Sequence, residues 1–243
     1  MNSFLKKLTT LCLLIPSVSY ASLSLDRTRT IFNGQEKSVS LKVYNSSERI
    51  PFLAQSWFEN GNGEKIETPF VVTPPIQRIE PKQQSQIKIE KLTNNQLPED
   101  RESVYYLNFR QIPPKSDKPN VLQLTIQTKT KLFYRPASLF MEGTEISNQP
   151  WQKKLVLKDT SQGFTAVNPT PYYITISAIS VSKDKESFEG FESFMIAPFS
   201  ELALNFKANQ VGNTPYITYI DDYGSKKVMP FSCVNAKCSI INE

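Results

Sequence analysis

Histidine is absent from this 243-residue sequence. Serine and cysteine hydrolases that use an imidazole base are therefore excluded, as are the commonest zinc and iron sites. Glycine is scarce, with 8 residues, and neither the P-loop pattern nor the dinucleotide-binding glycine pattern occurs. We therefore expect no enzyme activity, no cofactor and no metal.

A strong net charge is also lacking. The chain carries +5, of which two units come from Lys6 and Lys7, and it has no arginine-rich run. A nucleic-acid-binding protein would carry a clustered basic footprint, so we do not expect nucleic acid as a partner. The modest positive excess is suited instead to a cleft that binds a carboxylate.

No hydrophobic run reaches the length that spans a membrane. The run Leu8–Val18 follows two lysines, is too short to cross a bilayer, and precedes the small residues of Ser19-Tyr20-Ala21. This pattern predicts a secretory signal peptide at residues 1–21 and an exported protein that does not insert into the membrane. The alternative, a buried N-terminal helix, is disfavoured by Pro16.

Cysteine is rare, and the predicted signal peptide contains Cys12, one of the three. The remaining pair, Cys233 and Cys238, is even in number and close in sequence, which in an exported protein predicts one disulfide closing a hairpin-like loop. The spacing differs from the Cys-x-x-Cys of redox sites, so we expect a structural bond.

What the chain does have is a series of short alternating segments separated by turn residues, which predicts an all-β protein. No long segment has helical periodicity. Two series of strands fit two immunoglobulin-like β-sandwiches, at 22–141 and 142–243, with the polar stretch Glu142–Gln149 as linker. The expected strands are Ser38–Tyr44, Phe52–Phe58, Ser85–Ile89, Ser103–Ile112 and Val121–Phe133, then Lys154–Leu157, Phe164–Val167, Tyr173–Val181, Glu201–Phe206, Tyr216–Ile220 and Val228–Cys233.

The most informative of these segments is Val121–Phe133. Leu122, Leu124 and Ile126 alternate with polar residues, so they share one face of an extended strand. We expect a cation, Lys131, at the end of the same row. Such a strand could bind an extended peptide and its terminal carboxylate; the plainer interpretation is a half-buried sandwich strand with solvated lysines.

Several motifs resemble those of periplasmic pilus chaperones of the chaperone–usher class. The most specific block runs from Leu97 through Tyr105-Tyr106-Leu107-Asn108-Phe109-Arg110 to Pro114, with Phe109 where an aliphatic residue is more usual. The resemblance covers the whole mature chain. Other matching motifs are Asp26-Arg27-Thr28-Arg29, Thr73-Pro74-Pro75, Lys131-Leu132-Phe133-Tyr134-Arg135, Asn168-Pro169-Thr170-Pro171-Tyr172-Tyr173 and Asp222-Tyr223-Gly224.

The resemblance implies two immunoglobulin-like domains at an angle, with a cleft between them, in a periplasmic protein that binds, folds and caps pilus subunits. Such a chaperone lends a strand to the subunit and delivers it to the outer-membrane usher; when free, a self-capping homodimer is considered. Carried over to this chain, the lent strand contains Leu122, Leu124 and Ile126. The subunit carboxylate would be bound by Arg29 and Lys131.

The resemblance also implies a buried interdomain charge cluster of Glu102, Arg135 and Asp222, with a structural role. The loop Pro113–Asn120 is short, as in chaperones of rod-forming pili. The alternative from another class is an extracytoplasmic β-sandwich adhesin or receptor-binding protein, whose site would need clustered aromatic residues and polar loops.

Overall fold

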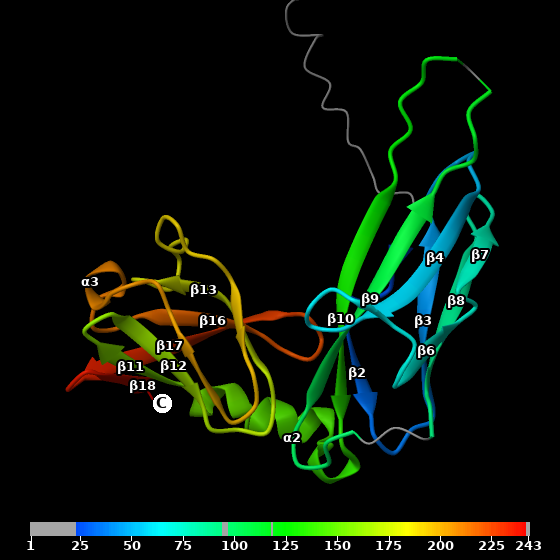
Figure 1. Ribbon diagram of the computed structural model, residues 1–243. Coiled ribbons are helices and arrows are strands. Elements are labelled where there is room, and N and C mark those ends of the chain that lie inside the picture. The colour runs from blue at the N-terminus through cyan, green and yellow to red at the C-terminus, as the bar shows by residue number, and fades with distance from the viewer. Residues whose placement is uncertain (1–22, 94–96, 118, 242–243) are drawn as a thin grey trace, which may run out of the picture.

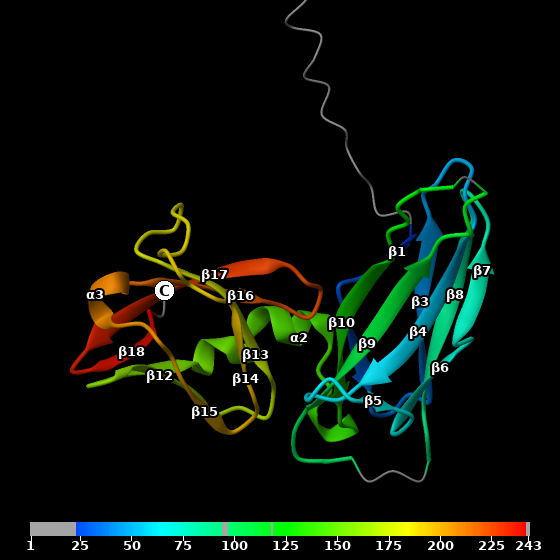
Figure 2. The ribbon, with the colours of Figure 1, turned by 45° about the horizontal axis from the view of Figure 1, so that its top comes forward.

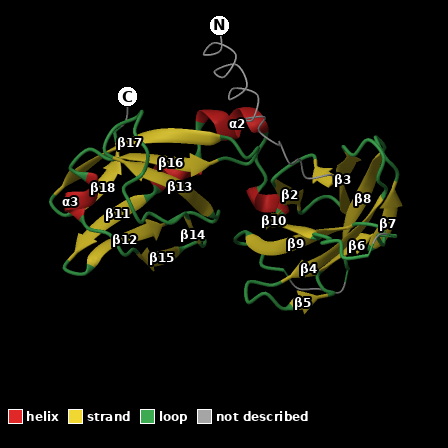
Figure 3. Ribbon diagram, turned by 90° about the horizontal axis from the view of Figure 1, so that it is seen from above, coloured by secondary structure: helices red, strands yellow, loops and turns green. Residues whose placement is uncertain are grey.

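The structure is a computed structural model that describes residues 23–93, 97–117 and 119–241 (Figure 1). The predicted signal peptide lies outside the described residues. Two β domains are joined at an angle, as Figure 3 also shows from above. The predicted all-β class and the two-domain architecture are confirmed.

The N-terminal domain is a sandwich of two sheets. One sheet has the order β1-β3-β8-β6, formed by β1 (Leu23–Leu25), β3 (Ser38–Asn45), β8 (Gln84–Lys91) and β6 (Phe70–Thr73). The other has the order β2-β10-β9-β4-β5, with β7 also paired to β4, and is formed by β2 (Arg29–Asn33), β10 (Ile126–Arg135), β9 (Ser103–Ile112), β4 (Phe52–Glu59), β5 (Lys65–Ile66) and β7 (Ile76–Ile79).

Alternation along the strands makes the core of this sandwich. In β3, Leu41 and Val43 are buried while Lys42 and Tyr44 are exposed, as period-two geometry requires. Phe70 of the facing sheet packs on the ring of Phe32 with ring centroids 5.0 Å apart. Four of the five strands expected in this domain are therefore observed with ends within two residues of the expected ones, and the fifth, Val121–Phe133, begins later.

The C-terminal domain is formed by eight strands in the order β14-β13-β16-β17-β18-β11-β12-β15. These are β11 (Val156–Thr160), β12 (Gly163–Asn168), β13 (Ile174–Ser180), β14 (Phe194–Ile196), β15 (Ser200–Ala203), β16 (Tyr216–Ile220), β17 (Lys226–Val234) and β18 (Lys237–Ile240), with the short helix α3 (Ala208–Val211) between β15 and β16. Cys233 and Cys238 face each other across the β17–β18 hairpin and form the predicted disulfide.

The stretch expected to be a linker has more structure than its polarity indicated. It contains the helix α2 (Gly143–Asn148), which is preceded by a 3₁₀ turn (Ala137–Leu139) and followed by another (Trp151–Lys154). Ile146 of α2 packs against the core of the C-terminal domain, which stabilises a helix too short to persist alone. Figure 2 shows α2 at the junction of the two domains.

The strand expected at Val121–Phe133 begins later, at Ile126, and residues 121–125 belong to the long connection that projects from the sheet in Figure 1. The neighbouring strand β9 explains the difference. It ends at Ile112 and is followed by Pro113 and Pro114, which have no N–H to donate. β10 therefore has no ladder partner before Ile126, which pairs with Gln111.

Candidate functional site

One edge of β10 is only half covered. On one side β10 pairs with β9 from Ile126 to Tyr134. On the other side the parallel strand β2 pairs with residues 131–135 alone. Within the described ranges, residues 126–130 therefore have no strand partner on this edge, where β10 faces the other domain (Figure 2). Unpaired backbone groups of this kind are a template for adding a further strand.

The open edge ends at two cations. Lys131 and Arg29 are direct register partners in the parallel ladder, at the first pair that β2 makes. The Arg29 guanidinium lies 5.7 Å from the centroid of the Phe133 ring and donates one hydrogen bond, of 3.4 Å, to the Ile220 carbonyl. Its Nε is buried without a hydrogen-bond partner among the described residues.

Neither of these cations forms an ion pair in the part of the chain that the structure describes, whereas the nearby Arg27 pairs with Asp26 at 2.8 Å. Burial lowers the pKa of Arg29, although Asp222 and Asp221 act in the opposite direction. Burial also lowers the pKa of Lys131, and repulsion from Arg29 adds to the effect. Two half-buried like charges that form no ion pair with a described residue favour the binding of an anion.

The apolar row lies beside the same edge. Leu122, Leu124 and Ile126 are 82%, 70% and 42% exposed, so most of their surface is free to be buried by a partner. The row continues along β10 into Leu132, which is in the domain core. The expectation that Lys131 ends this row is wrong: Lys131 has the opposite parity, and projects on the face from which Phe133 packs against Tyr173 of the C-terminal domain.

The predicted charge cluster of Glu102, Arg135 and Asp222 joins the two domains. The Arg135 side chain is 1% exposed and donates from Nε to Glu102 at 2.7 Å. Its two terminal nitrogens donate to the two oxygens of Asp222 at 2.8 and 3.1 Å. Glu102 also accepts the backbone N–H of Tyr173 at 2.8 Å. Burial raises the pKa of Glu102 to about 7, against the opposing effect of Arg135.

Two aromatic residues in this cluster were not singled out from the sequence. Trp151 and Tyr172 stack with ring centroids 4.5 Å apart, and both lie close to the Arg135 guanidinium, at 4.9 and 5.1 Å. Tyr172 belongs to a motif quoted for the resemblance, so its position could have been proposed; Trp151 had no such indication. The rings shield the cation from water and fix its plane.

Of the two cations, Arg29 lines a cavity between the domains. Its lining comes from the N-terminal strand region, the α2 segment and the β16–β17 turn. The lining residues are Asp26, Arg27, Arg29, Ile31, Arg135, Phe140, Met141, Gly143, Ile146, Asp222 and Tyr223.

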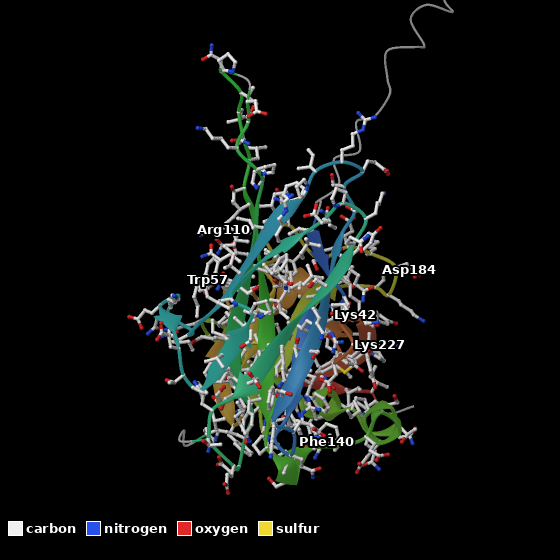
Figure 4. All side chains as sticks on the ribbon, turned by 90° about the vertical axis from the view of Figure 1, so that its right-hand side faces the viewer. Lys42, Trp57, Arg110, Phe140, Asp184 and Lys227 are labelled. Atoms are coloured by element: carbon white, nitrogen blue, oxygen red, sulfur yellow. A yellow bond between two sulfur atoms is a disulfide. The ribbon has the colours of Figure 1, made fainter. Side chains whose placement is uncertain are left out.

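A second polar network, also missed from the sequence, covers the outer face of the sheet beside the open edge. The Arg110 guanidinium stacks 4.8 Å from the centroid of the Trp57 ring, and Figure 4 labels both residues. Trp57 Nε1 donates to Glu59 Oε1 at 3.0 Å, and Glu59 Oε2 is 2.5 Å from Lys129 Nζ. No short sequence pattern links these residues, because they come from three adjacent strands.

Among residues 23–93, 97–117 and 119–241 no group of three or more Asp, Glu, Cys or His side chains could hold a metal ion. No helix in these ranges is long and apolar enough to cross a membrane.

Two immunoglobulin-like sandwiches, a cleft between them and an open strand edge that ends at paired cations define the class of two-domain pilus chaperones. The comparisons with known proteins agree. Residues 22–140 match the family described as pili and flagellar-assembly chaperone, PapD N-terminal domain, and residues 150–230 match the PapD C-terminal domain. The chain belongs to the PapD family of pilus chaperones.

Individual relatives are similar over almost the whole chain. The chaperone protein PapD of Escherichia coli is 45% identical over 234 residues, which cover 95% of each chain. The chaperone protein PmfD of Proteus mirabilis is 41% identical and covers 99% of this chain and 96% of its own.

Among solved structures, the periplasmic chaperone SfaE is 32% identical with a TM-score of 0.68, covering 86% of this chain and 98% of its own. The SafB chaperone in complex with the SafA pilin of Salmonella enterica gives a match of 26% identity and a TM-score of 0.72, covering 89% of this chain and 99% of that one.

Proposed function

We propose that this protein is a periplasmic chaperone that binds, folds and caps pilus subunits by donor-strand complementation and delivers them to the outer-membrane usher. The observation that carries the proposal is the open edge of β10, which ends at Arg29 and Lys131, two cations that form no ion pair with any described residue. Family membership and the similarity to a chaperone that was solved with a pilin support it. As a chaperone of this family, the protein would act by binding rather than catalysis.

The edge geometry favours one direction for the added strand. β2 runs parallel to β10 and begins at Arg29, so it occupies the part of the edge formed by residues 131–135. A subunit strand that pairs with residues 126–130 and ends in a carboxylate at Arg29 and Lys131 would run from residue 126 toward residue 131. It would therefore be parallel to β10 and lie in line with β2.

The two parts of the site would contribute differently. Backbone hydrogen bonds to residues 126–130 supply affinity that depends little on sequence, while Leu122, Leu124 and Ile126 would fill an apolar groove in the subunit. Arginine offers a planar fork to a carboxylate and lysine a point charge. Together they would fix where the subunit strand ends.

The remaining predicted features would support this site. We assign residues 22–141 and 142–243 to the two domains, and the Glu102, Arg135 and Asp222 cluster to holding the angle between them. A buried cluster of this kind is weak evidence for net stability, but the loss of one member leaves a charge unpaired. The disulfide would stabilise the C-terminal domain, since it lies in the β17–β18 hairpin and not at the open edge.

The test is subunit capture by Arg29→Ala and Lys131→Ala variants. A tagged chaperone is expressed with a pilus subunit and purified from the periplasm, and the bound subunit is quantified. Truncating one partner of a desolvated charge pair typically costs about 2–5 kcal/mol, or roughly 30- to 5000-fold in affinity. Lys88→Ala, at an exposed lysine of β8 that pairs with Glu90, is the matched control. Normal subunit yield from both cleft variants would refute the carboxylate anchor.

A further inference from the structure

A strand that adds to the open edge of β10 could bind in more than one register. A slip by one residue would turn each of its side chains to the opposite face, but a slip by two residues preserves every face. Lys129 and Lys131 project from the same face of β10, about 6.6 Å apart along the strand. A carboxylate bound at Lys129 would therefore correspond to a strand that is two residues out of register.

The structure gives these two lysines different surroundings. Lys129 Nζ lies 2.5 Å from Glu59 Oε2 and 5.5 Å from the centroid of the Tyr106 ring. Within the described residues Lys131 forms no ion pair, and its charged neighbour is Arg29. Lys129 is thus neutralised by the protein itself, whereas Lys131 is available to a ligand.

Glu59 is held in the position that makes this distinction. By register Glu59 lies opposite Tyr106 of β9, and Tyr106 lies opposite Lys131, so Glu59 and Lys131 are in the same row of the sheet. Glu59 nevertheless pairs diagonally with Lys129. Its other oxygen accepts a 3.0 Å hydrogen bond from Trp57 Nε1, and its side chain is only 13% exposed.

The charge state of Glu59 is consistent with this pairing. Hydrogen bonding to Lys129 lowers the pKa of the Glu59 carboxyl, and the bond from Trp57 acts in the same direction. Glu59 therefore carries a full negative charge at neutral pH.

We propose that Glu59 determines the register of the captured strand, because it neutralises Lys129 and leaves Arg29 and Lys131 as the cations that bind the terminal carboxylate. Trp57 is a positioning residue that acts through Glu59. The inference rests on the proposed function, since it concerns the same open edge. It adds a specificity-determining residue on β4, two strands away from the edge.

The experiment measures the preference for a free carboxylate at the peptide terminus. The probe is a fluorescently labelled peptide of alternating valine and threonine with a free C-terminal carboxylate, compared by anisotropy with its C-terminal amide. Wild type should prefer the carboxylate peptide, and Lys131→Ala should lose most of that preference. The double variant Glu59→Gln with Lys131→Ala should regain about tenfold of it, because Lys129 is then free to bind the carboxylate.

The matched control is Glu48→Gln with Lys131→Ala, which frees Lys82 from an exposed pair outside β10 and its neighbours and should restore nothing. Glutamine at position 59 can still accept the hydrogen bond from Trp57, so circular dichroism should show an unchanged fold. Structural damage does not restore binding, which makes the recovery diagnostic. A folded Glu59→Gln, Lys131→Ala variant that stays without preference overturns the register inference alone. Absence of the preference in wild type overturns the proposed carboxylate anchor as well.

Discussion

Replacing Leu124 with glutamate should abolish capture of a pilus subunit while leaving the free chaperone folded. Leu124 is 70% exposed and precedes β10, so the substitution removes little packing from the free protein. Its free energy of unfolding should change by no more than about 0.5 kcal/mol, as is usual for exposed positions.

The effect on the complex is expected to be much larger. Fully burying a leucine side chain contributes about 1.5–3 kcal/mol, and the exposed fraction means that most of this would be gained only when the subunit binds. Glutamate loses that contribution, and in an apolar groove its unpaired carboxylate costs several kcal/mol more. The sum corresponds to at least a thousandfold loss of affinity.

The assay is periplasmic co-purification with a subunit, scored against wild type after circular dichroism has shown that each variant is folded. Thr125→Glu is the matched control, because a side chain at position 125 projects from the other face of an extended strand. Leu132→Ala, in the same row but fully buried, should instead destabilise the free chaperone by about 2–5 kcal/mol. Equal loss of capture at positions 124 and 125 would mean that the strand is lent in another register, and full retention at both would mean that it is not lent.

The interdomain cluster and the disulfide are open to three further tests. Asp222→Asn removes the carboxylate that binds both terminal nitrogens of Arg135 and should lower the free energy of unfolding in urea by about 3 kcal/mol; an unchanged midpoint would contradict the structural role. Because burial raises the pKa of Glu102 from 4.5 to about 7, the folded state binds more protons between these values, so this contribution to stability should fall as pH rises from 5 to 7 and be absent in Glu102→Gln. Reducing Cys233–Cys238 should lower the melting temperature but preserve subunit capture in the cold, whereas loss of capture by folded, reduced protein would link the bond to the binding edge.

Sequence pattern predicted strands such as β3 and β4 well because buried and more exposed side chains alternate along them. The segment Ser103–Ile112 was placed with the bounds that the structure has. The short strands β5 and β14 were missed because two or three residues are too few for alternation to be read. Helix α2 was missed for a different reason: its stability comes from packing against the C-terminal domain and not from its own sequence.

The candidate site residues were named through the motifs, but their arrangement could not have been derived from them. Arg29 and Lys131 are distant in sequence and meet only because β2 pairs in parallel with residues 131–135 of β10. The same pairing leaves the edge open at residues 126–130. The position at which β2 begins therefore sets both the length of the edge and the site where the cations lie, and only the sheet topology contains that information.

The two lysines of β10 are the clearest case of this limit. In sequence, Lys129-Thr130-Lys131 presents two equivalent cations on one face of a strand. The difference between them comes from Glu59, which reaches Lys129 across β9 and is oriented by the indole of Trp57. A chain with the same lysines but no acid at position 59 would present two unpaired cations along one edge. Its choice between the two registers would then depend on Arg29 alone.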